Sequence, residues 1–227
     1  MKNLFKLFTP LFLAMCIVLA CTKQTPFDPE QGKNMEYVDL GLSVLWAKNN
    51  IGAVSPFDYG SKFAWGEIST KEEYDWSNYQ WCKNGSNYAI TKYNNFEKIG
   101  KVDNKLTLDP GDDAASTVLG NGWRMPTVNE LQELLDNCVY TQDKNGIYYF
   151  YNPKLDDNGN RVYPDAIYFA EGIWTASVCE INPQQAYNFL VVEFREKDAN
   201  GNEIKIMKPT TGHRSKGYAV RPVKNRE

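Results

Sequence analysis

Histidine is almost absent from this sequence, and cysteine is scarce. Among 227 residues there is one histidine, His213, and none of the five cysteines belongs to a Cys-x-x-Cys pair. Zinc sites are built from closely spaced cysteine and histidine ligands, so we predict no metal site and no cofactor. Ser215 is only a sequence neighbour of His213, which does not provide the geometry of a catalytic triad. The segment around His213 is therefore predicted to be a polar surface loop.

An excess of positive charge is also missing. The chain has 25 basic and 28 acidic residues, and removal of residues 1–20 would take away Lys2 and Lys6 and leave 23 against 28, a net charge of −5. Domains that bind nucleic acid carry strongly basic surfaces. Nucleic acid is therefore not expected as a partner.

Long hydrophobic runs are lacking except at the N-terminus. Leu7–Ala20 follows two lysines and is too short for a membrane span, so it is predicted to be an export signal. It ends in Val18-Leu-Ala-Cys21, which resembles the bacterial lipobox, where a peptidase cuts before the cysteine and the cysteine is acylated. The resemblance implies lipidation of Cys21 and anchoring of the folded part outside the cytoplasm, on a bacterial membrane such as the outer membrane, facing either the periplasm or the exterior. The alternative is an ordinary cleaved signal with an unused cysteine.

The predicted organisation has three parts. Residues 1–20 are a lipoprotein signal peptide, residues 21–35 are a flexible tether from the lipidated cysteine, and residues 36–227 form a single domain. Aromatic residues make up 14% of the chain, which is typical of exported β-rich domains. Three cysteines remain in the domain, Cys82, Cys138 and Cys179, and the sequence leaves open whether two form a disulfide or all three are free thiols.

Two helices are predicted in the middle of the chain. Thr127 and Glu130 have the spacing of a capping box, which starts a helix. The apolar residues that follow fall on one helical face: Val128, Leu131, Leu134, Leu135 and Cys138. A shorter helix, Pro110–Leu119, is predicted before it, with Asp109 as its N-cap and Gly120 at its C-terminus.

Arg124 lies in the connection between these helices. We interpret it as a structural residue whose partner is Asp112 or Asp113, and the alternative partner is a ligand carboxylate or a sugar hydroxyl.

Strands are predicted on both sides of the helices. Two short apolar stretches around Gly41 predict paired strands at the start of the domain. After the helices the predicted strands are 147–151, 161–163, 166–169, 172–178, 186–194, 203–207 and 218–223. Asn-Gly pairs within 143–146, 157–159 and 198–201 predict two-residue hairpin turns. Calcium is the alternative explanation for the oxygen-rich residues Asp156, Asp157, Asn158 and Asn160, but no complete EF-hand loop is present.

Aromatic residues crowd the segment 74–96, which has no helical or strand period. We predict a long ordered loop. Its aromatic side chains either pack the loop onto the body, which we favour, or stack on sugar rings. The candidate ligand contacts are Tyr74, Trp76, Tyr79 and Trp81 in this loop, together with Arg124.

Several motifs together resemble one bacterial family over nearly the whole mature domain. They are Tyr37–Ala47, Phe63-Ala-Trp-Gly-Glu67, Asp113-Ala-Ala115, Gly122-Trp-Arg-Met-Pro-Thr127 with Glu130, and Gly217-Tyr-Ala-Val-Arg-Pro-Val223. The resemblance is to the major paralogous domain family first named from Fibrobacter. It implies an α+β, C-type lectin-like fold, with two helices flanking a small twisted antiparallel sheet, further β hairpins, and a strand near Val38 paired with the closing strand near Val220.

Two activities of similar folds are not implied for this chain. Calcium-dependent lectins resemble one another in a Glu-Pro-Asn or Gln-Pro-Asp tripeptide with a later Trp-Asn-Asp, and the nearest segment here is Asn182-Pro-Gln184. Formylglycine-generating enzymes need a late cysteine pair, and only Cys179 lies in that region.

Three classes of function follow from these features. We expect a non-catalytic, lipid-anchored binding domain that recognises a glycan or a protein through its loops. A cell-envelope or filament assembly subunit with exposed β edges is the alternative. An enzyme is less expected, because carboxylates such as Glu171, Glu180 and Glu193 occur in any acidic protein.

Overall fold

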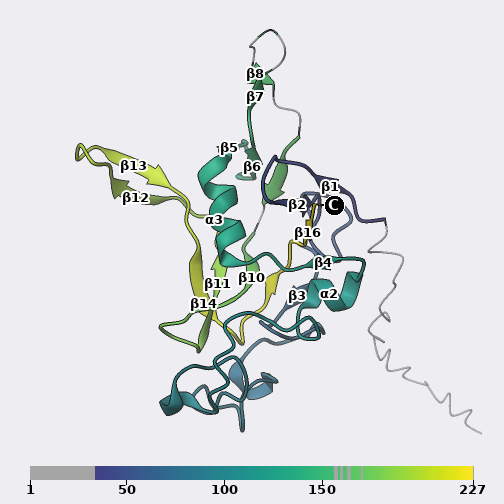
Figure 1. Ribbon diagram of the computed structural model, residues 1–227, viewed down its shortest axis with the longest axis vertical. Coiled ribbons are helices and arrows are strands. Elements are labelled where there is room, and N and C mark those ends of the chain that lie inside the picture. The colour runs from purple at the N-terminus through teal and green to yellow at the C-terminus, as the bar shows by residue number, and fades with distance from the viewer. Residues whose placement is uncertain (1–33, 156–157, 159–160, 163–164, 170, 227) are drawn as a thin grey trace, which may run out of the picture.

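The domain is α+β, as the sequence predicts. The computed structural model describes residues 34–155, 158, 161–162, 165–169 and 171–226. The signal peptide, Cys21 and most of the tether lie outside these residues. The described part contains two α-helices and several sheets whose strands are mostly antiparallel (Figure 1). No helix in this part of the chain has both the length and the apolar character needed to cross a membrane.

The strands of the described residues form five sheets. One sheet has the order β1 (Tyr37–Val38), β2 (Val44–Ala47), β16 (Val223–Asn225) and β4 (Trp123–Arg124). The largest has the order β14 (Thr210–His213), β11 (Gln185–Phe189), β10 (Ile173–Val178), β15 (Tyr218–Ala219) and β3 (Lys62–Phe63). A third contains β5 (Val139–Gln142), β6 (Tyr148–Tyr151) and β9 (Ile167–Phe169), and two ribbons are β7 (Lys154–Leu155) with β8 (Arg161–Val162) and β12 (Phe194–Lys197) with β13 (Glu203–Ile206).

The closing strand meets the start of the domain, but not at the predicted strand. β16 pairs with β2, with Val223 opposite Trp46, while β1 pairs with the other edge of β2. The direct pairing expected near Val38 is therefore wrong. The side chain of Asp39 accepts a hydrogen bond from the backbone N–H of Gly41 (2.8 Å), and Gly41 has φ +72°, so the chain turns back and places β2 between the first and last strands.

The second predicted helix is confirmed, including its cap. In α3 (Val128–Asn137), the Thr127 hydroxyl accepts from the Glu130 N–H (3.2 Å), and the Glu130 carboxylate accepts from the Thr127 N–H (2.7 Å). Leu131 and Leu134 are fully buried, so the predicted face packs into the core.

The first predicted helix is shorter than expected. α2 spans Ala114–Leu119, and its N-cap is Asp113, whose side chain accepts from the Ser116 N–H (2.9 Å). The prediction of Asp109 as the cap was wrong because Asp109 begins a separate turn, in which its carbonyl accepts from the Asp112 N–H. Gly120 ends the helix with φ +58°, as predicted.

Two of the three predicted hairpin turns occur where the sequence places them, but with a different geometry. In the β5–β6 and β12–β13 turns only the glycines, Gly146 (φ +83°) and Gly201 (φ +85°), have positive φ. Asp143 and Asp198 each accept hydrogen bonds from two backbone N–H groups of their turns, which fixes longer loops than the predicted two residues. β7 and β8 also pair, whereas most of their turn, with the calcium alternative, lies outside the described residues.

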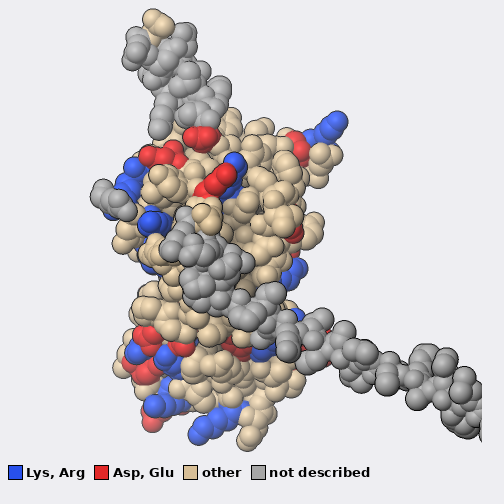
Figure 2. Space-filling view, turned by 90° about the vertical axis from the view of Figure 1, so that its right-hand side faces the viewer, with Lys and Arg blue, Asp and Glu red and all other residues tan. Residues whose placement is uncertain are grey.

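Two clusters of buried apolar side chains form the core. One packs α3 against β2, β6, β9 and β11, and the other gathers Trp65, Tyr93, Trp123 and Trp174 beneath the long loops. β10 is buried along its whole length and lies between β11 and β15. Cys82, Cys138 and Cys179 are all free, so the three-thiol alternative holds. On the face shown in Figure 2, acidic and basic residues are interspersed rather than separated by sign.

Candidate functional site

The long aromatic loop is held to the sheet by a buried arginine that the sequence did not single out. Arg214 follows β14 and is fully buried. Its guanidinium donates to the Tyr79 hydroxyl (2.9 Å) and to the carbonyl oxygens of Tyr93 (3.2 Å), Pro183 (3.1 Å) and Lys92 (3.0 Å). The planar fork of five donors thus joins segments that are far apart in the chain.

Aromatic rings surround the same guanidinium. Its central carbon lies 4.7 Å from the ring centroid of Trp65, 5.4 Å from that of Tyr79 and 5.9 Å from that of Tyr93. Stacking of a weakly hydrated cation on aromatic faces lowers the cost of burying it. Arg214 therefore acts as a structural centre for the loop and is the main residue that the sequence interpretation missed.

Tyr79 belongs to this structural centre. It is 3% exposed, and its hydroxyl donates to the Trp65 carbonyl oxygen (2.8 Å) while accepting from Arg214. Burial raises the pKa of the Tyr79 hydroxyl well above its ordinary value. Tyr79, one of the candidate ligand contacts, therefore lies in the interior of the fold.

Two more of the candidate aromatics are half-buried and bonded to the backbone. The Trp81 indole N–H donates to the Gly66 carbonyl oxygen (2.6 Å), and the Tyr74 hydroxyl donates to the Lys62 carbonyl oxygen (2.5 Å). The Tyr74 ring also covers Gly217, where an added Cβ would lie 2.7 Å from the ring. These contacts are of the kind expected if the aromatics pack the loop onto the body.

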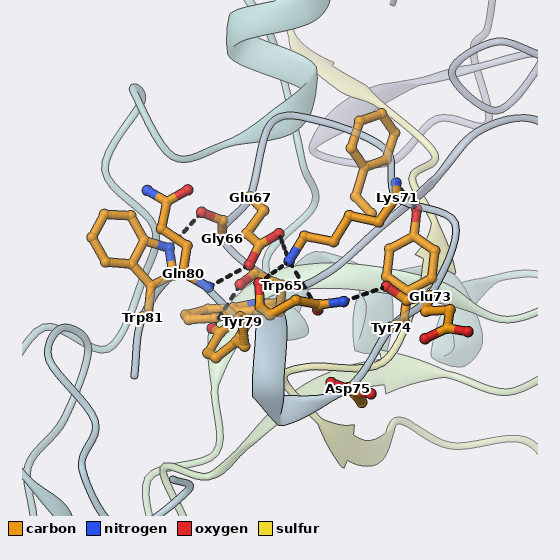
Figure 3. Close-up of polar contacts among 12 residues, drawn as sticks. Trp65, Gly66, Glu67, Lys71, Glu73, Tyr74, Asp75, Tyr79, Gln80 and Trp81 are labelled. Carbon is orange, nitrogen blue, oxygen red and sulfur yellow. Dashed lines mark hydrogen bonds and ion pairs between the residues drawn. The ribbon is translucent and has the colours of Figure 1, made fainter. Parts of the chain in front are cut away.

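An ion pair with a buried carboxylate closes the start of the loop. Glu67 is 4% exposed, and its carboxylate accepts from the Gln80 N–H (2.7 Å) and pairs with Lys71 Nζ (2.6 Å) (Figure 3). Lys71 Nζ also donates to the Asn78 carbonyl oxygen (2.5 Å). The segment that carries Trp76 is therefore fixed from both ends.

Trp76 lies at the outer side of this framework. It begins the 3₁₀-helix η1 (Trp76–Asn78), which Asp75 caps by accepting from the N–H and the hydroxyl of Ser77 (2.7 and 2.6 Å). The half-buried indole makes edge contacts with Tyr79 (centroids 5.3 Å apart) and with His213 at the end of β14 (6.2 Å).

Exposed polar side chains lie next to Trp76 in the chain and along β14, the strand that carries His213. Thr211 and His213 alternate along β14 and are both exposed, as are Asp75, which caps η1, and Ser77 within it. The Thr211 hydroxyl donates to the Gln185 side-chain oxygen (2.6 Å). We call Asp75, Trp76, Ser77, Thr211 and His213 the Trp76 surface. It combines one fixed aromatic ring with hydroxyl, carboxylate and imidazole groups, which can donate and accept hydrogen bonds.

Arg124 is bonded within the fold, but not to either predicted partner. Its guanidinium forms two hydrogen bonds with the Glu130 carboxylate (2.8 and 2.5 Å) and one with the Asn225 side-chain oxygen (2.9 Å). Asp113 is occupied by the N–H groups of Ser116 and Met125. Since β4 directs Arg124 toward the start of α3, the capping-box glutamate is the carboxylate within reach.

Asp112, the other predicted partner of Arg124, belongs to a separate charge cluster. Lys92 pairs with Asp112 (2.5 Å) and with Asp109 (2.8 Å), and Asp112 also accepts from the Tyr93 hydroxyl (2.5 Å). Hydrogen bonds from Lys105 and Lys92 lower the pKa of Asp109 to about 2. The cluster ties the aromatic loop to the segment that precedes α2.

The remaining candidate chemical groups have other surroundings. Ser215 is buried, and its hydroxyl has no hydrogen-bond partner among the described residues, so it is not bonded to His213. Glu171 pairs with Lys62 (3.0 Å) and Glu193 with Lys205 (2.7 Å). Among the residues that the structure describes, no group of three or more histidine, cysteine, aspartate or glutamate side chains could hold a metal ion.

Comparisons with protein-family models, with curated proteins and with solved structures each found no match for this chain.

Proposed function

We propose that this chain is a non-catalytic, lipid-anchored extracytoplasmic domain that binds a glycan at the Trp76 surface. The observation that carries the proposal is the placement of Trp76, a partly exposed indole fixed between Tyr79 and His213 on a loop that Arg214 and Glu67 hold in place. A binding residue that is already fixed loses little conformational entropy when its ligand arrives.

The chemistry of the surface suits a sugar. The apolar C–H face of a pyranose ring stacks on an indole, and its hydroxyls need partners that both donate and accept. Asp75, Ser77, Thr211 and His213 supply such groups from two neighbouring elements. Ligand sites combine an apolar contact with a few well-placed polar groups in this way.

We further propose that the scaffold is C-type lectin-like, as the resemblance to the major paralogous domain family implies. The support is the meeting of the closing strand β16 with β2 near the start of the domain, together with two helices beside a small antiparallel sheet. Long loops projecting from such a rigid frame are common places for recognition.

A glycan array tests the proposal. We expect saturable binding of the wild-type chain to a defined glycan, and loss of that binding in the Trp76→Ala variant. Tyr37→Ala is the matched control, because Tyr37 is an aromatic residue that is 57% exposed in β1. Equal binding by the two variants would contradict the assignment, and parallel arrays with calcium and with chelator show whether a cation takes part.

An assembly subunit remains the alternative, and one observation favours it. The β12–β13 ribbon projects from the body in Figure 1, and strand pairing could extend either of its edges. The charges on this ribbon count against the alternative, because charged side chains disfavour edge-to-edge pairing. The two strands carry Arg195, Glu196, Lys197, Glu203 and Lys205. A folded chain that binds no glycan but forms concentration-dependent filaments would support this alternative.

A further inference from the structure

A second exposed feature lies in the loop 50–61, outside the Trp76 surface. The loop is closed at its base by a hydrogen bond from the Ser61 N–H to the Ile51 carbonyl oxygen (2.7 Å), as in an Ω-loop. Its tip exposes three large apolar side chains, Val54 (91% exposed), Phe57 (52%) and Tyr59 (54%). Exposed apolar side chains clustered in one short segment mark an interaction surface more often than scattered ones do.

The fold holds this tip in a fixed shape. Gly60 has φ +72°, and an added Cβ would lie 2.4 Å from the Ile51 carbonyl oxygen. Asp58 accepts hydrogen bonds from the N–H groups of Val54 and Gly60 (both 3.1 Å), so its charge is used inside the loop.

A second buried arginine supports the base of the loop. Arg221 Nε donates to the Asn50 side-chain oxygen (2.7 Å), and the Asn50 amide donates to the Tyr59 carbonyl oxygen (3.0 Å). The exposure of Val54, Phe57 and Tyr59 is therefore built into the structure.

The loop lies where the described chain begins. A groove of about 540 Å³ is lined by Gly52 to Pro56 and by Asn34, Met35 and Glu36. Lys48 fixes this entry, because its N–H donates to the Glu36 carbonyl oxygen (2.9 Å) and its side chain pairs with the Glu36 carboxylate (2.6 Å). Thirteen residue steps separate Cys21 from Asn34, which limits their separation to roughly 45 Å.

From this placement we propose that the tip of loop 50–61 inserts Val54, Phe57 and Tyr59 into the interface of the bilayer that holds the lipid anchor, and so orients the domain on the membrane. The inference rests on the lipid anchoring of the proposed function. A short tether gives the loop a high effective concentration at the lipid surface, so weak contacts suffice. Aromatic and aliphatic side chains favour the boundary between headgroups and acyl chains.

Site-specific fluorescence on the full-length acylated protein tests the proposal. Val54→Cys and, as control, Ile181→Cys are made in a Cys82→Ser background and labelled with an environment-sensitive fluorophore. Ile181 is 84% exposed in the β10–β11 connection, and Cys138 and Cys179 are buried. The proteins are reconstituted into vesicles of phosphatidylethanolamine and phosphatidylglycerol. We expect a lipid-borne quencher to act several-fold more strongly on the label at position 54 than on the label at position 181.

The outcomes separate the two proposals. Equal quenching of both labels by a water-soluble quencher would overturn the membrane contact. A label at position 54 that neither the lipid-borne nor the water-soluble quencher reaches would also overturn it, because a protein would then cover the loop. Flotation of the wild-type protein with vesicles, lost in a chain that begins at Thr22 and so carries neither the signal peptide nor Cys21, tests the anchor by itself. A protein that floats but leaves position 54 in water refutes only the loop contact, whereas a wild-type protein that does not float refutes the anchor.

Discussion

Arg214 and Tyr79 are joined by a hydrogen bond of 2.9 Å between two groups that are both almost completely buried, although 135 positions separate them in the chain. The Tyr79 hydroxyl in turn donates a hydrogen bond to the Trp65 carbonyl oxygen. The guanidinium reaches the aromatic loop, the β10–β11 connection and the core rings together.

Replacing Arg214 is expected to destabilise the whole domain. Arg214→Met keeps much of the side-chain volume but leaves the Tyr79 oxygen and three carbonyl oxygens without their donor, and we expect a loss of about 2–4 kcal/mol in the free energy of unfolding. Urea unfolding measures the change. Arg195→Met, at an exposed position on β12, is the control and is expected to stay within about 0.5 kcal/mol of wild type. A loss as small for Arg214→Met would contradict its central role.

Gly217 is expected to tolerate no side chain. In Gly217→Ala the new methyl group would lie 2.7 Å from the Tyr74 ring, so the ring or the backbone must move, and we expect a loss of about 1–3 kcal/mol. Gly111→Ala is the matched control, since no atom lies within 4 Å of its added Cβ. Thermal unfolding of both variants checks the prediction, and equal midpoints would show that the Tyr74 ring moves away freely.

Arg124 and Glu130 are expected to be energetically coupled. Glu130 caps α3 and binds Arg124 through both oxygens, so a double-mutant cycle with Arg124→Met and Glu130→Gln should give a coupling energy of about 1 kcal/mol or more. The exposed pair Lys208–Glu196, with an N–O distance of 2.5 Å, provides the comparison and should give less than about 0.5 kcal/mol. Equal coupling in the two cycles would contradict a special role for the capping-box pair.

Stability is expected to fall in alkaline solution. Burial raises the pKa of Cys138 to about 12, whereas a thiol in the unfolded chain titrates near 8.5. Between these values the folded chain keeps a proton that the unfolded chain has lost, so the stabilisation is complete at neutral pH and decreases as pH rises, by at most about 1.4 kcal/mol per pH unit. Urea unfolding at pH 7, 9 and 10.5 measures the slope. Cys138→Ala lowers stability throughout but should flatten the slope, and an unchanged slope would show that other groups cause it.

Features set by neighbouring residues could be predicted from the sequence. The capping box at Thr127 and Glu130, the end of α2 at Gly120 and the positions of the β5–β6 and β12–β13 turns all depend on contacts within a few residues. The start of α2 was misplaced because three aspartates compete within five residues, and only the backbone path shows that Asp113 is the cap.

Features set by the folded arrangement could not be predicted. Arg214 looked like one polar residue of a surface loop beside His213, and nothing nearby in the sequence indicates that aromatic rings and carbonyl oxygens will surround it. The pairing of Arg124 with Glu130 depends on the direction of β4, and the pairing of β16 with β2 depends on the turn at Gly41. The loop 50–61 contains turn-forming residues such as Pro56 and Gly60, whereas the exposure of its apolar tip follows from the position of its base.

The pairing of β2 with β16 also bears on how the domain responds to force. In this antiparallel pair Val44 at the start of β2 lies opposite Asn225 at the end of β16, and Arg226 reaches back to Asp39 and to the Leu42 carbonyl oxygen. Because β1 and β16 both run antiparallel to β2, the chain enters this sheet at Tyr37, opposite Ala47, and leaves it at Asn225, opposite Val44, which are the two opposite ends of β2. A pull between the two ends of the domain therefore loads the hydrogen bonds of the sheet together in shear instead of unzipping them one after another, and this sheet is expected to resist stretching.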